Sequence, residues 1–196
     1  MFKPLRVCFG GLLSLLLVAC FGSSTTIEQS WRAPDVELDK LRNVVTVYIA
    51  PDGSIRRTIE DEMASKLVRK GIRAKPMYMV LTEEDLLDRD RAKARLIAAG
   101  FDGVVAIRLV SRESSAGSLD DYWGSAWPSV YDPNYAFTDV VVRVETNVYS
   151  LANNELVWSA LSRTIDPATS RTVVEEVTTL VAGELAARGV VISSRR

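Results

Sequence analysis

The pattern that decides the fold is residues 139–164, which read DVVVRVETNVYSLANNELVWSALSRT. Apolar and polar side chains alternate from Asp139 to Leu151. The predicted inner face holds Val140, Val142, Val144 and Val148, and the predicted outer face holds Arg143, Glu145, Asn147 and Tyr149. This alternation is typical of a strand that buries one face. Asn153-Asn154 predicts a turn and Glu155–Thr164 the returning strand, so the stretch predicts an antiparallel hairpin.

Three more strands are predicted on the N-terminal side of the hairpin, over residues 43–50, 74–81 and 101–110. The first and third are rich in β-branched residues, and helical patterns separate the three. In the second, Pro76 suggests an edge or strand-start position. The first helical pattern repeats every four residues, through Ile55, Ile59, Met63 and Leu67. Such a repeat predicts an amphipathic helix with one apolar face. A shorter helix is predicted around residues 92–99.

A last helix is predicted to begin at Thr169 or Ser170, after Asp166-Pro167, and to end at Gly189. The resulting order is β-α-β-α-β, a long loop, then β-β-α. The helices between the first strands imply crossover connections, whereas the hairpin is antiparallel. We therefore expect an α/β (α+β) fold: a single mixed sheet of about five strands with three main helices, packed mainly on one face.

The first 19 residues predict a secretory signal. Lys3 and Arg6 give it a positive start, and Val7–Ala19 carries no charge. Thirteen residues are too few for a helix that spans a bilayer, which needs about 20. The length and the flanks fit the apolar region of a signal peptide instead.

The end of this segment, Leu17-Val18-Ala19-Cys20, resembles the lipobox of bacterial lipoproteins. The resemblance implies cleavage before Cys20, which would then carry a diacylglycerol and an N-acyl chain such as palmitate. An ordinary secretory signal followed by a chance cysteine is the alternative. Phe21, where inner-membrane lipoproteins tend to carry aspartate, favours the outer membrane facing the periplasm over the inner membrane. We expect a signal over 1–19, a flexible tether over 20–26 and one domain over 27–193.

Composition excludes several classes of function. Without residues 1–19, 22 basic residues face 25 acidic ones, so the net charge is near −3 and gives no electrostatic case for nucleic acid. The chain has no histidine, which removes the commonest general base and the commonest metal ligand. We expect no catalytic residues, no metal site, no enzyme activity and no cofactor apart from the covalent lipid on Cys20.

Several short motifs, in this order, make the chain similar to a family of uncharacterised bacterial lipoproteins. They are Trp31-Arg32 with Pro34, Arg57 and Glu60, Ala99–Val104, Val144–Tyr149, Leu156–Ser159 and Asp166-Pro167. The resemblance spans most of the mature chain and implies location and fold, because the family has no established activity. The plan is also similar to small α/β domains of envelope-assembly lipoproteins, such as those of the curli-export and penicillin-binding-protein-activating kinds.

The predicted long loop, residues 113–139, holds six of the fifteen aromatic residues of the chain. Five of them are candidates for binding a partner: Tyr122, Trp123, Trp127, Tyr131 and Tyr135. Tyr and Trp suit protein interfaces and sugar stacking. The competing interpretation, which we favour, is that they fold back over the sheet and complete the core. Asp132-Pro133-Asn134 in this loop hints at calcium, but a plain turn explains it better.

Three arginines on predicted strands, Arg108, Arg143 and Arg163, could form a patch for an anionic glycan or lipid headgroup. The competing interpretation is that they pair with Glu145 and other acids on the solvated face, which we favour.

The sequence thus predicts a tethered, non-enzymatic envelope module that binds or scaffolds an envelope protein or peptidoglycan. The alternative is a carrier or sensor of a small ligand, such as a lipid or a glycan fragment. A closed apolar cavity between the sheet and a helix layer would favour the carrier. A flat, exposed surface of aromatic residues and arginines would favour the scaffold.

Overall fold

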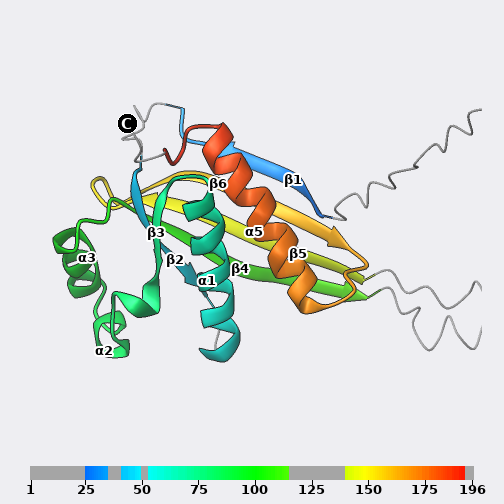
Figure 1. The fold of residues 1–196 in the computed structure, drawn as a ribbon, viewed down its shortest axis with the longest axis horizontal. Coiled ribbons are helices and arrows are strands. Elements are labelled where there is room, and N and C mark those ends of the chain that lie inside the picture. The colour runs from blue at the N-terminus through cyan, green and yellow to red at the C-terminus, as the bar shows by residue number, and fades with distance from the viewer. Residues whose placement is uncertain (1–24, 35–40, 50–52, 115–139, 193–196) are drawn as a thin grey trace, which may run out of the picture.

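The structure is a computed structural model in which residues 25–34, 41–49, 53–114 and 140–192 are described (Figure 1). Within them six strands form one mixed sheet: β1 (Thr25–Arg32), β2 (Asn43–Tyr48), β3 (Arg73–Pro76), β4 (Gly103–Ser114), β5 (Val140–Ser150) and β6 (Glu155–Ile165). The helices are α1 (Gly53–Arg69), α2 (Glu83–Leu86), α3 (Arg89–Ala98) and α5 (Ser170–Ala187), with a 3-10 turn η1 (Met77–Met79).

The strands lie in the order β1-β6-β5-β4-β2-β3. β2 runs parallel to β3 and β4, and the other neighbours are antiparallel. The predicted mixed sheet is therefore confirmed. The predicted 139–164 hairpin is β5 and β6, with Asn154 in the left-handed region at φ 59° in the turn.

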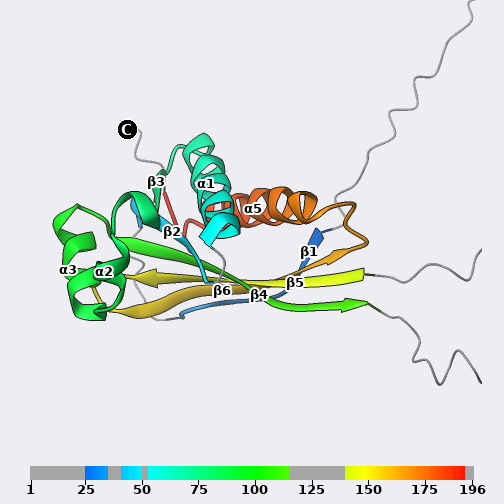
Figure 2. The same cartoon turned by 90° about the horizontal axis from the view of Figure 1, so that it is seen from below.

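The helices divide the sheet into a covered face and an open face. α1 and α5 lie side by side on the covered face (Figures 1 and 2). The main core lies beneath them and includes Val44, Val148 and the fully buried Trp158. α2 and α3 lie at the end of the sheet where β4 begins and β5 turns into β6 (Figure 2). A second, smaller core there joins Val45, on the side of β2 that faces away from α1, to Leu96 and other apolar side chains. The open face is the one that carries Arg143 and Glu145.

Two predicted segments differ from the structure at the edges of the sheet. The sixth strand is β1, which sequence analysis predicted only as an extended tether and start of the domain. Its Thr25 and Thr26 pair with Thr164 and Arg163, so the strand begins inside the predicted tether. The predicted strand 74–81 is shorter in the structure. β3 ends at Pro76, which has no N–H to donate, and η1 follows because Met77 turns into the smaller core.

The motif Ala99–Val104 forms a junction between α3, β2, β4 and β5. Asp102 is its one charged residue. Gly100 ends α3 in the left-handed region at φ 79°, where glycine is favoured. The Asp102 carboxylate accepts the backbone N–H of Arg42 at 2.8 Å and of Asn43 at 3.0 Å. Gly103 follows at the start of β4, close to Leu41, so the motif is accounted for by folding.

Residues 1–24 and 115–139 lie outside the described residues. Cys20 and the candidates Tyr122, Trp123, Trp127, Tyr131 and Tyr135 fall there, as does the calcium motif. No helix among the described residues is long and apolar enough to cross a membrane.

Candidate functional site

A hollow with mostly apolar walls lies between α1, α5 and the covered face, and we call it the α1–α5 cleft. It has a volume of about 340 Å³. The two helices diverge toward their N-terminal ends above β4 and β5 (Figure 1). The lining comprises Tyr48, Ile55, Ile59, Ile107, Leu109, Arg112, Val142, Val144, residues 167–170, Val173, Val174, Val177 and Thr178.

The floor and walls of the cleft follow from two periodic patterns. The alternation of β5 sends Val142 and Val144 to the covered face, where they form part of the floor. The four-residue repeats of the helices place Ile55 and Ile59 on one wall and Val173, with its neighbours, on the other. The patterns therefore predict apolar faces. Because the helices diverge, part of those faces stays uncovered and forms the cleft.

Polar groups line part of the cleft. Tyr48 is buried, and burial raises the pKa of its phenol, while a hydrogen bond with the Leu109 backbone acts in the opposite direction. Arg112 is exposed and forms no ion pair with any other residue that the structure describes. Thr169 and Ser170, at the start of α5, are also exposed. Among the described residues, no carboxylate belongs to the lining.

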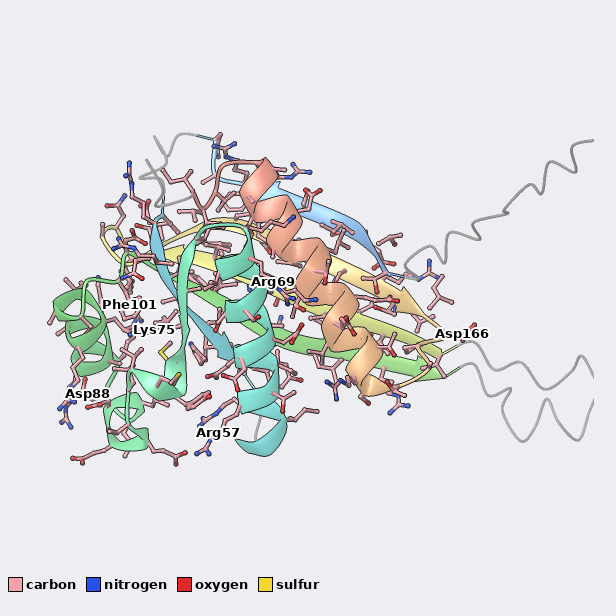
Figure 3. All side chains as sticks on the ribbon, in the orientation of Figure 1. Arg57, Arg69, Lys75, Asp88, Phe101 and Asp166 are labelled. Carbon is pink, nitrogen blue, oxygen red and sulfur yellow. The ribbon has the colours of Figure 1, made fainter. Side chains whose placement is uncertain are left out.

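Asp166 shapes the end of the cleft where β6 turns into α5 (Figure 3). Its backbone is in the left-handed region at φ 46°. Its carboxylate accepts the backbone N–H of Val140 at 2.7 Å, and its own N–H donates to the Val140 carbonyl at 2.8 Å. These bonds join the start of β5 to the Pro167–Ser170 turn, which lines the cleft.

The three candidate arginines lie away from the cleft, on the open face. Arg108 forms an ion pair with Glu145, its cross-strand neighbour. Arg143 on β5 and Arg163 on β6 are cross-strand neighbours. Both form ion pairs with Glu28, with distances from Nε to a carboxylate oxygen of 3.2 Å for Arg143 and 3.6 Å for Arg163. This is the pairing with acids that we favoured from the sequence. The prediction of an anion patch finds no support, because each arginine already has a carboxylate partner.

Sequence analysis missed the role of Glu60, which lies on α1 and is only 1% exposed. Its carboxylate accepts the backbone N–H of Tyr48 at 3.2 Å and of Tyr78 at 3.3 Å. Burial raises its pKa, and these hydrogen bonds partly offset that rise. Arg57, labelled in Figure 3, lies 5.3 Å from the centre of the Tyr78 ring. Arg57 and Glu60 therefore fix α1 against the region around η1.

No group of three or more acidic, cysteine or histidine side chains among the described residues is placed to hold a metal ion.

No protein-family model matches this chain, and no curated protein matches it significantly. Similar solved structures include two of the PelC dodecamer from Paraburkholderia phytofirmans. One is 15% identical, covers 88% of this chain and 99% of PelC, and has a TM-score of 0.48. The other, a leucine-to-methionine variant, is 17% identical, with coverages of 87% and 99% and a TM-score of 0.47.

A third similar structure is that of the lipoprotein GNA1162 from Neisseria meningitidis. It is 16% identical, covers 74% of this chain and 96% of GNA1162, and has a TM-score of 0.42. One of these neighbours is thus itself a lipoprotein. Identities and TM-scores this low do not establish a shared function.

Proposed function

We propose that this chain is a lipid-anchored, non-enzymatic module of the bacterial envelope whose α1–α5 cleft binds the apolar part of a small envelope ligand. The observation that carries the proposal is the cleft itself, a hollow of about 340 Å³ between the sheet and the helix layer. Small-molecule pockets typically have about 300–1,000 Å³ and mostly apolar walls. The cleft is open rather than closed, but its apolar walls and its place between the sheet and the helices support the carrier over the scaffold.

The apolar lining favours a ligand with an alkyl chain. Each methylene buried from water contributes about 0.8 kcal/mol, so a chain in the cleft is held strongly against water. Transfer from a bilayer into the cleft exchanges one apolar environment for another and is close to neutral. A cleft of this kind suits exchange of a lipid with a membrane better than permanent storage.

The membrane part of the proposal rests on Cys20. A short positive start, an apolar stretch, Ala19 and the cysteine coincide in the order of a lipoprotein signal. Several acyl chains on one residue hold a protein far more firmly than one chain does. The proposed location is the outer membrane, with the domain facing the periplasm.

The non-enzymatic part rests on chemistry that the residues can supply. The chain has no histidine, and the cleft is lined by apolar side chains, hydroxyls and one arginine. General acid–base catalysis needs a proton donor or acceptor that titrates near the working pH. The cleft residues offer a surface for binding rather than such a pair.

A scaffolding role is the second candidate, and the open face favours it. Trp31 on β1 is 48% exposed and Tyr149 on β5 is 37% exposed. Exposed aromatic side chains are enriched in protein interfaces. If this face binds an envelope protein or peptidoglycan, replacing both residues by Ala should abolish crosslinking to that partner in intact cells and leave the cleft unaffected.

The direct test is a titration of residues 21–196, produced without signal and lipid, with fatty acids of increasing chain length, followed by calorimetry. Affinity should rise with chain length. Val174→Trp, which puts a large ring into the cleft, should abolish binding. Thr179→Trp, on the exposed side of the same helix, is the control and should bind as the wild type does. Equal binding by both variants would rule the cleft out as the site.

A further inference from the structure

We infer that the α1–α5 cleft receives one acyl chain of an anionic lipid taken from the same membrane that holds the anchor. This inference rests on the proposed function and adds the class of ligand, its headgroup charge and its source. Three observations carry it: the position of Thr25, the charge of Arg112, which pairs with no carboxylate in the described part of the chain, and the size of the cleft.

The first observation is a row of paired residues that crosses the sheet. Thr25 on β1 pairs with Thr164 on β6, Thr164 pairs with Val142 on β5, and Val142 pairs with Arg112 on β4. Val142 and Arg112 both line the cleft. Neighbouring strands are about 4.8 Å apart, so the backbone of Thr25 lies about 14 Å from that of Arg112, which is three strands away.

The length of chain before Thr25 ties this row to the anchor. Cys20 precedes Thr25 by five residues, and an extended chain covers at most about 3.6 Å per residue, or about 18 Å in all. The lipid on Cys20 therefore holds the Thr25 end of the sheet close to the membrane. The start of β1, the start of β5 and the start of α5 all lie at that end (Figures 1 and 2).

The second observation is the charge at the cleft. Arg112 is exposed, and among the described residues no carboxylate neutralises it. The first turn of α5 lies beside the cleft and contains no acidic residue, so the positive end of its helix dipole adds to the same field. Since no carboxylate lines the cleft among the residues that the structure describes, the cleft electrostatics favour an anionic headgroup over a zwitterionic or cationic one.

The third observation is size. A volume of about 340 Å³ lies at the lower end of the range for small-molecule pockets. It suits one acyl chain, so the second chain of a two-chain lipid would stay in the bilayer. Arg112 then meets the headgroup while the apolar floor holds the chain.

The test uses the full lipidated protein in phosphatidylcholine vesicles that contain a trace of phosphatidylglycerol with a diazirine on one acyl chain. After irradiation, mass spectrometry of the peptides locates the crosslinks. We expect crosslinks on the cleft segments of β5 and α5. Phosphatidylcholine carrying the same diazirine should give about fivefold fewer, because its trimethylammonium group brings a positive charge beside Arg112, an effect of the size of one exposed charge interaction.

Two charge variants sharpen the test. Arg112→Glu should remove the preference for phosphatidylglycerol, whereas Arg89→Glu, an exposed arginine on α3, should keep it. Equal cleft crosslinking by both lipids would overturn the headgroup claim and leave the proposed function standing. Crosslinks absent from the cleft, in a protein that still binds fatty acid, would overturn the membrane source. Loss of fatty-acid binding as well would overturn the proposed function itself.

Discussion

Glu60 is the residue whose chemistry departs most from what its position on a helix would suggest. Its carboxyl group is buried and accepts two backbone N–H groups, from Tyr48 and Tyr78. Burial disfavours the charged form and raises the pKa above 4.5, although the hydrogen bonds and Arg56 partly offset the rise. The folded chain therefore holds this proton more tightly than the unfolded chain does.

The pH dependence follows from that sign. The contribution of Glu60 to stability is fully present below pH 4.5 and is lost as the pH rises through its raised pKa. Urea denaturation at several pH values from 4.5 to 7 should show this fall in the free energy of unfolding. Glu60→Gln should lack it, and Glu155→Gln, an exposed control, should keep it. An unchanged pH profile in Glu60→Gln would contradict the assignment.

Asp102 supports a second prediction at this scale. Its carboxylate accepts the N–H groups of Arg42 and Asn43 at the start of β2. Asp102→Ala leaves both donors without this acceptor and should lower the free energy of unfolding by about 2 kcal/mol. The matched change Glu155→Ala, at an exposed position, should cost far less in the same urea titration. Equal losses would mean that the junction does not depend on Asp102.

Neither role could be predicted from the sequence, and the reason is physical. The donors to Glu60 come from Tyr48 and Tyr78, which are 12 and 18 residues away along the chain. An acidic residue on an amphipathic helix carries no mark of partners that only the fold brings near. The Asp102 motif was visible as a pattern, but its cause, the start of β2, was not.

Helices and strands were most predictable where a periodic pattern of apolar residues extends over many residues. The β5–β6 hairpin and α5 were both predicted, because alternation and helical repeats run over many residues there. β1 was not predicted as a strand, since Glu28, Gln29 and Ser30 break the alternation and it depends on pairing with β6. The cleft was also invisible, because its lining comes from five separate elements, β2, α1, β4, β5 and α5, and from the turn before α5.

Two glycines give opposite predictions for their elements. A Cβ on Gly103, at the start of β4, would lie 2.6 Å from Leu41 Cδ1 and 3.2 Å from the Tyr149 carbonyl oxygen. Gly103→Ala should therefore lower the free energy of unfolding, by roughly 1–3 kcal/mol. Gly183, within α5, has no such atom within 4 Å.

Gly183→Ala should stabilise the protein by about 0.5–1 kcal/mol, because alanine restricts the unfolded chain and favours the helix. Thermal unfolding of both variants beside the wild type measures the two effects together. A stabilised Gly103→Ala or a destabilised Gly183→Ala would show that the packing around these elements differs from that described.

At the scale of the whole molecule, the proposed anchor and the cleft belong to one arrangement. Cys20 is close in sequence to Thr25, and Thr25 shares a cross-strand row with Arg112. Cys20→Ser should release the protein from the membrane fraction, because the acyl chains have no other attachment site in the mature chain. Cell fractionation measures this, and a variant that stays with the membrane would contradict the anchor.

The most direct test of the cleft as a lipid-binding site is native mass spectrometry of the anchored protein purified from its own membrane. We predict an added mass, beyond that of the covalent anchor, equal to one non-covalently bound lipid. It should be retained in Thr179→Trp and lost in Val174→Trp. A protein without that added mass, or a Val174→Trp variant that keeps it, would contradict the account.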